Sequence, residues 1–159
     1  MGTVDGSVLG PDGGQVDTGA DGCAAAPPMM TDSPGTCTWQ THCGHGYWFC
    51  TNNRDWDAAR SDCQGIGGDL LSINDQQEQD FVRTHATGGN QWIVGLNKQG
   101  ASGDNAADVW EWVDASLAMG GYENFRNGEP DGNDCGAIDS GLWIDWACGN
   151  PENWICEVP

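Results

Sequence analysis

The sequence is poor in basic residues. Its 159 residues include 5 Lys and Arg against 24 Asp and Glu, a formal net charge of -19. Because a strongly negative surface repels phosphate groups, nucleic acids and anionic membrane surfaces are unfavourable partners. Long apolar runs are also lacking: the longest have about six residues, whereas a membrane-spanning helix needs ~20. The composition therefore argues against nucleic-acid binding and against membrane insertion.

The N-terminal segment lacks basic and aromatic residues altogether. Residues 1–36 contain five Asp and much Gly, Pro, Ser and Thr. Such a composition buries too little apolar surface to offset the entropy of ordering the chain. We therefore expect residues 1–36 to form an acidic Gly/Asp/Pro-rich linker or stalk, and residues 37–159 to form one domain. The basic and apolar regions of a signal peptide are not visible in this chain.

Two residue types are unusually abundant. Eight cysteines in a chain of this length indicate an oxidising compartment, so the sequence predicts a secreted or cell-surface, extracellular protein. Nine tryptophans against three phenylalanines and two tyrosines predict either a small core filled by large rings or a surface that stacks on ligands.

The apolar pattern predicts two early helices followed by short strands, which is typical of an α+β domain. The first helix is expected near Asp55, capped by Asn52 or Asn53. The second is expected after Asn74, with Gln77 as the other half of a capping box. Strands are expected at residues 70–73, 92–96, 109–113, 136–138, 142–144 and 154–156. Residues 114–134 look irregular, and a loop of that length inside a compact domain is usually functional.

A series of motifs occurs in order over residues 43–157. It comprises Cys63, Gly67-Gly68, Leu70-Leu71-Ser72-Ile73, Trp92-Ile93-Val94-Gly95-Leu96, Trp110-Glu111-Trp112, Glu129-Pro130-Asp131, Asp134-Cys135, Trp143-Ile144-Asp145, Cys148 and Cys156-Glu157. Together these motifs resemble the C-type lectin domain. The resemblance implies a C-type lectin-like fold: two helices, small antiparallel sheets and a long calcium-binding loop region stapled by disulfides.

The same resemblance implies two disulfides, Cys63 with Cys156 and Cys135 with Cys148. Four further cysteines allow three pairings among which the sequence does not choose: Cys23, Cys37, Cys43 and Cys50. An alternative use of this region is a zinc site that combines Cys37 and Cys43 with His42 and His45. An oxidising compartment favours disulfides over zinc.

A cluster of oxygen-bearing side chains lies in the loop region. The residues are Glu129, Asp131, Asn133, Asp134 and Asp145. Carboxylate and amide oxygens are the ligands that Ca²⁺ prefers. The resemblance implies that these residues bind calcium as the cofactor, and that the Glu129–Pro130 peptide bond is cis.

The resemblance further implies a carbohydrate as the partner. Glu129, Asp131, Asn133 and Asp145 would bind a vicinal diol of a sugar through the calcium ion, and Trp146 would stack on the sugar ring. By the same resemblance, Glu129 at the first position of the motif is typical of mannose-type members and Asp131 at the third position of galactose-type members. The carboxylates of Glu129 and Asp131, with stacking on Trp146, favour galactose-type over mannose-type ligands. A shallow site of this kind binds single sugars weakly, so an oligomer would supply avidity.

Two departures from the family pattern support an alternative function. Ile144 stands where the family has an Asn ligand, and the loop between Asp131 and Cys135 is short. The alternative is a C-type lectin-like domain that binds protein, with calcium structural or absent. A second calcium between Glu78 and Glu157 is also implied by the resemblance. No nucleophile stands beside a base in a recognisable hydrolase pattern, so we do not expect an enzyme.

Overall fold

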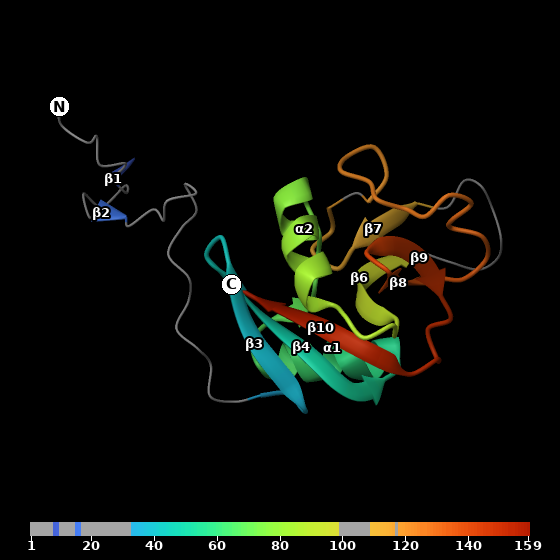
Figure 1. Cartoon of the computed structure of the whole chain (residues 1–159), viewed down its shortest axis with the longest axis horizontal. Coiled ribbons are helices and arrows are strands. Elements are labelled where there is room, and N and C mark those ends of the chain that lie inside the picture. The colour runs from blue at the N-terminus through green and yellow to red at the C-terminus, as the bar shows by residue number, and fades with distance from the viewer. Residues whose placement is uncertain (1–7, 10–14, 17–32, 99–108, 117) are drawn as a thin grey trace.

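The computed structural model describes residues 33–98, 109–116 and 118–159, together with two short strands at residues 8–9 and 15–16. Figure 1 shows the arrangement of the elements. In chain order they are β1 (Val8–Leu9), β2 (Gln15–Val16), β3 (Cys37–His42), β4 (His45–Arg54), α1 (Trp56–Gly65), β5 (Asp69–Leu70), α2 (Gln76–His85), β6 (Trp92–Lys98), β7 (Trp110–Trp112), β8 (Cys135–Asp139), β9 (Leu142–Trp146) and β10 (Glu152–Val158). Most of residues 1–36 lie outside the described residues, so the predicted linker and its boundary stay a prediction.

One sheet organises the domain. Its strands follow the order β3-β4-β10-β6-β8-β9, while β5 pairs with β10 and β7 pairs with β6. β10 runs parallel to β6 and antiparallel to β4, so the last strand of the chain ties the N-terminal hairpin to the C-terminal half. Two helices and a mainly antiparallel sheet confirm the α+β class and agree with the C-type lectin-like fold that the resemblance implies.

Both helices begin one or more residues later than the sequence predicted. α1 is capped by Asp55, whose carboxylate accepts the Ala58 N–H at 2.8 Å. The predicted caps Asn52 and Asn53 are wrong because these residues belong to β4.

In α2 the cap is Asp75, which accepts the Glu78 N–H at 2.9 Å. The predicted cap Asn74 is therefore wrong. Glu78, and not Gln77, reaches back to the start of the helix, where its Oε2 accepts the Asn74 N–H at 3.0 Å.

The hairpin of β3 and β4 was missed by the sequence analysis. Its polar side chains and paired cysteines hide the period-two pattern of a strand, yet six residue pairs align from Cys37↔Cys50 to His42↔His45. Alternation along β4 explains how the sheet acquires two apolar faces. Tyr47 and Phe49 join the cluster that includes Val82 of α2, whereas Trp48 and Cys50 join the cluster that includes Ala59 of α1.

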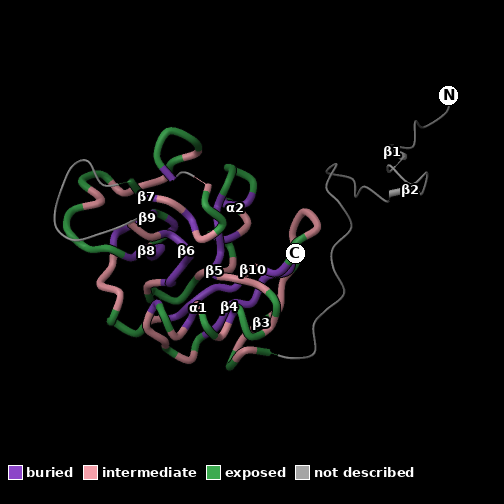
Figure 2. The backbone as a smooth tube through the Cα atoms, turned by 180° about the vertical axis from the view of Figure 1, so that it is seen from behind, coloured by how far each residue is buried: buried purple, intermediate pink, exposed green. Residues whose placement is uncertain are grey.

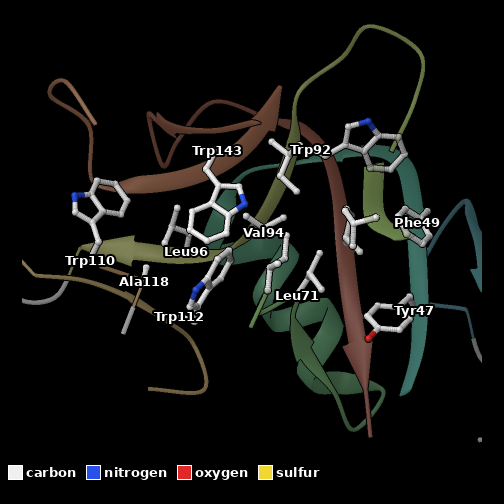
Figure 3. Packing of buried hydrophobic residues seen from close by; sticks show 14 residues of the cluster. Tyr47, Phe49, Leu71, Trp92, Val94, Leu96, Trp110, Trp112, Ala118 and Trp143 are labelled. Carbon is white, nitrogen blue, oxygen red and sulfur yellow. The ribbon is translucent and has the colours of Figure 1, made fainter. Parts of the chain in front are cut away.

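Tryptophan fills the core. Seven of the nine indoles are buried: Trp48, Trp56, Trp92, Trp110, Trp112, Trp143 and Trp154. Trp143 and Trp112 meet edge to face at 4.9 Å between ring centroids (Figure 3). Figure 2 shows the buried backbone concentrated in the middle strands of the sheet, with β3 at a more exposed edge. The high tryptophan content predicted either a core filled by large rings or a surface that stacks on ligands. The first alternative accounts for these seven residues.

Between residues that the structure describes, disulfides close the fold at three places. The structure contains Cys63–Cys156 and Cys135–Cys148, the pairs that the resemblance implies, and Cys37–Cys50 across the β3–β4 hairpin. Cys43 is also disulfide-bonded, and Cys23 lies outside the described residues. The cysteines of the alternative zinc site are thus engaged as disulfides. Neither helix of the described chain is long and apolar enough to cross a membrane.

Candidate metal-binding site

Three carboxylates converge where the loop before β8 meets β9. Asp145 lies in β9 opposite Gly136 of β8, and Glu129 and Asp131 come from the loop that leads into β8. One carboxylate oxygen from each of Glu129, Asp131 and Asp145 lies within 4.8 Å of the others. In the described residues this is the one group of three or more His, Cys, Asp or Glu side chains with such spacing. The Glu129–Pro130 peptide bond is cis, as expected.

Asp145 organises the loop. It is 4 % exposed, and it accepts N–H bonds from Asp131 at 3.2 Å, from Gly132 at 2.9 Å and from Asn133. Its own N–H donates to Glu129 Oε2 at 3.3 Å. The short loop that the sequence analysis noted is therefore folded around the Asp145 carboxylate.

The closeness of Glu129 and Asp145 separates their pKa values. The hydrogen bond with the Asp145 carboxylate, together with desolvation and the negative charges of Asp145 and Asp131, raises the pKa of Glu129 to about 7. Burial opposes ionisation of Asp145, but the bonds from Glu129 and from the three backbone N–H groups outweigh it and lower the pKa of Asp145 to about 2. Without a cation, the pair is therefore most stable when it shares a proton.

This arrangement fits a hard divalent cation. The donor set is entirely oxygen, and the carboxylates repel one another unless a proton or a cation lies among them. Each carboxylate oxygen has more than one lone pair, so Asp145 can keep its backbone bonds while it coordinates a metal. Three carboxylates supply fewer than the 6–8 oxygens that Ca²⁺ takes, so a ligand that brings its own oxygens would complete the shell.

The other two predicted calcium ligands lie differently. Asn133 is exposed, and its backbone N–H points to Asp145. Asp134 is outside the cluster: its Oδ1 lies 3.6 Å from Lys98 Nζ, and its backbone oxygen accepts the Lys98 N–H at 2.9 Å. The Lys98 side chain is 6 % exposed at the end of β6. Sequence reasoning missed Lys98, although a basic residue at the end of an apolar strand in so acidic a chain was a usable signal.

The residues beside Asp145 face away from the cluster. Successive side chains of a strand point to opposite faces, so Ile144 and Trp146 leave β9 on the face opposite Asp145. Ile144 is 5 % exposed and buried. Trp146 is half-buried, and its Nε1 is buried without a hydrogen-bond partner among the described residues. The strand geometry therefore argues against the predicted stacking of Trp146 on a ligand held by Asp145.

The second predicted pair, Glu78 and Glu157, lines a different cavity of about 180 Å³. Glu78 accepts the Tyr47 hydroxyl at 2.9 Å, while Glu157 accepts the Ser72 N–H at 3.2 Å and contacts His45 Nδ1. Burial, with the charge of Glu157, raises the pKa of Glu78 to about 7. Both carboxylates thus already have protein partners, and a calcium ion between them stays a prediction.

Comparison with known proteins identifies the family. The model of the Lectin C-type domain matches residues 52–158. The chain is 31% identical over 137 residues to C-type lectin domain family 10 member A of Homo sapiens, covering 78% of this chain and 41% of that protein. It is 33% identical over 130 residues to asialoglycoprotein receptor 1 of Rattus norvegicus, covering 76% and 43%. The aligned region thus spans less than half the length of these relatives.

A solved structure supports the same assignment. The cow C-type carbohydrate-recognition domain of CD23, determined in the presence of a GlcNAc2Man3 oligosaccharide, aligns with a TM-score of 0.65 at 28% identity. The alignment covers 77% of this chain and 95% of that one. With the fold, the disulfides and the matched model in agreement, this chain belongs to the C-type lectin family.

Proposed function

We propose that this protein is a carbohydrate-binding domain whose sugar site depends on Ca²⁺. The observation that carries the proposal is the cluster of Glu129, Asp131 and Asp145, held between the loop and β9 within 4.8 Å. These three residues would bind the ion. Asn133, exposed beside them, is the predicted further oxygen ligand. The membership of the family and the oligosaccharide in the bovine relative support the assignment.

The residues of the cluster would also bind the sugar directly. A bound Ca²⁺ would accept two neighbouring sugar hydroxyls as ligands. Ionised Glu129 and Asp131 would accept hydrogen bonds from those hydroxyls, and bonds to a charged acceptor are stronger than neutral ones. The buried Asp145 keeps its backbone bonds and so holds the loop in the shape that presents Asp131. Ile144, which is buried, contributes neither an oxygen nor a donor.

We propose galactose-type sugars as the ligand class, on the basis of Asp131 at the third position of the Glu-Pro-Asp motif. Trp146 is not part of this proposal, because it lies on the opposite face of β9. Without an aromatic platform the affinity for one sugar is weak, with a dissociation constant on the order of 1–10 mM. We propose that several copies act together on an extracellular surface, with residues 1–36 as the linker that carries residues 37–159.

A sugar-affinity experiment tests the proposal. The wild-type chain should be retained on galactose-coated resin in millimolar calcium and released by a chelator. Glu129→Gln and Asp145→Asn should abolish retention, whereas Asp57→Asn, an exposed residue of α1, should leave it unchanged. Release by mannose rather than galactose would overturn the ligand class. Failure to bind either sugar in calcium would favour the protein-binding alternative that the buried Ile144 supports.

A further inference from the structure

A second cavity shares no residue with the acidic cluster. Its volume is about 220 Å³. The lining residues come from four elements or their ends, and they are Thr38, Gln40, Phe49, Thr51, His85, Thr87 and Trp92. Thr38 of β3 pairs directly with Phe49 of β4, and α2 ends at His85, so the cavity lies between the sheet edge and the end of α2.

The floor of this cavity is aromatic. Phe49 and Trp92 are each 4 % exposed, and their rings meet edge to face at 6.0 Å (Figure 3). His85 packs 5.4 Å from Phe49 and 4.6 Å from Phe81. Aromatic faces at the bottom of a concave site provide an apolar surface for the C–H groups of a ligand.

The rim is polar and uncharged. Thr38, Thr51 and Thr87 are exposed hydroxyl residues, and Gln40 is a half-buried amide. His85 Nδ1 lies 2.9 Å from the Phe81 carbonyl oxygen. The same nitrogen lies 2.9 Å from the Thr84 hydroxyl, so Nδ1 is engaged within α2 and Nε2 is the ring nitrogen that a ligand would contact. The rim therefore offers both donors and acceptors to hydroxyl groups.

Charge and size narrow the class of ligand. None of the seven lining residues is acidic or a lysine or arginine, in a chain whose net charge is -19. The overall negative potential disfavours anions, and the lining lacks the carboxylates that a cation would need. The volume is below the ~300–1,000 Å³ of pockets for drug-sized ligands, which matches a single ring.

We propose that this cavity is a metal-independent subsite for one neutral pyranose ring. The sugar's apolar face lies on Phe49 and Trp92, and its hydroxyls bond to Gln40, His85 and the threonines of the rim. Sugar binding in this subsite does not require the calcium site. The metal-independent subsite and the calcium-dependent sugar site are therefore tested independently.

Nuclear magnetic resonance of the ¹⁵N-labelled chain in excess chelator tests the subsite. Galactose, glucose, mannose and N-acetylglucosamine are titrated separately up to about 50 mM, since a site of this size binds with a dissociation constant on the order of 1–10 mM. At least one of the four should shift the Trp92 indole N–H and the Thr87 amide together, and glucuronic acid should not. Signals near Asp145 should stay in place.

Variants distinguish the cavity from nonspecific contact. Gln40→Ala removes a rim amide, and His85→Phe keeps the ring but removes its nitrogens; each should weaken binding by about 2- to 12-fold, as expected for one lost hydrogen bond. Thr41→Val, on the opposite face of β3, is the matched control and should leave binding unchanged. Circular dichroism verifies that each variant folds.

Three results would overturn the subsite. The absence of shifts at Trp92 and Thr87 with all four sugars, or equal affinity in wild type, Gln40→Ala and His85→Phe, would show that this cavity binds no sugar. Binding that occurs only in calcium and disappears in Glu129→Gln would assign all sugar binding to the acidic cluster. Conversely, the wild-type chain could show no calcium-dependent sugar binding and still show the sugar-induced shifts at Trp92. That result would contradict the proposed calcium-dependent function and support the subsite.

Discussion

At the scale of single residues, the backbone bonds of Asp145 explain how a loop of few residues can gather three carboxylates. A buried carboxylate that accepts three N–H bonds fixes the path of residues 131–133, and that path brings Asp131 beside Glu129. The family motif predicted Glu129, Asp131 and Asp145 as a set. It did not predict the Lys98–Asp134 pair, because a contact between the end of β6 and the start of β8 depends on the strand register.

Asp134→Asn should change calcium affinity little, because Asp134 faces Lys98 and lies outside the cluster. We expect a decrease of less than about fivefold, the size of a screened effect from a half-exposed charge. Asp145→Asn should weaken calcium binding by more than about thirtyfold, since it removes a buried charged ligand. Isothermal titration of both variants measures the difference. Equal losses would show that Asp134 turns from Lys98 to the metal.

The buried Glu78 makes stability depend on pH. Its ordinary pKa is 4.5 and its pKa in the folded chain is about 7, so the folded state holds this proton more tightly than the unfolded state. The stability it contributes is complete below pH ~4.5 and is lost as pH rises through ~7. In the Glu78→Gln variant the side chain at this position is uncharged at every pH. The free energy of unfolding of the variant should therefore rise relative to that of wild type by about 2 kcal/mol between pH 5 and pH 8.

Urea denaturation of both chains in chelator at several pH values measures this change. A difference between Glu78→Gln and wild type that stays constant from pH 5 to pH 8 would show that Glu78 is not protonated in the folded state.

At the scale of elements, the sequence predicted the existence of α1, α2 and β6 to β10 better than their ends. A short continuous apolar run such as residues 92–96 predicts a buried strand. Caps were misplaced by one residue or more because Asn and Asp are both good cap residues and stand side by side at 74 and 75. The β3–β4 hairpin was missed because the edge strand β3 carries polar side chains and the buried residues 46–50 of β4 do not alternate with polar ones. Strand pairing, Cys37–Cys50 and the contact of Tyr47 with α2 stabilise the hairpin.

The cap of α2 can be located by substitution. Asp75→Ala should reduce the free energy of unfolding by about 1 kcal/mol, because it leaves the Glu78 N–H without its side-chain acceptor. Gln77→Ala, at an exposed position of the first turn, should have an effect below about 0.5 kcal/mol. Thermal or urea unfolding compares them. Equal stability of the two variants would contradict Asp75 as the cap.

At the scale of the whole molecule, β10 and the Cys63–Cys156 bridge connect the ends of the domain. The bridge spans 93 residues, against 13 for Cys37–Cys50. If the bridges act mainly on the unfolded chain, replacing Cys63 and Cys156 by Ala should reduce stability by about 4–5 kcal/mol, against about 3 kcal/mol for Cys37 and Cys50. Urea denaturation of both double variants tests this order. A larger loss at the hairpin would contradict it.

The central claim is that Glu129, Asp131 and Asp145 form a calcium site through which the sugar binds. The most direct measurement is one calorimetric titration in two steps, calcium into chelator-treated chain and then galactose into the calcium-loaded chain, for wild type and Glu129→Gln. We expect calcium binding at this cluster followed by millimolar galactose binding in wild type, and loss of both at the cluster in Glu129→Gln. Calcium and galactose binding of wild-type strength in Glu129→Gln would contradict the claim.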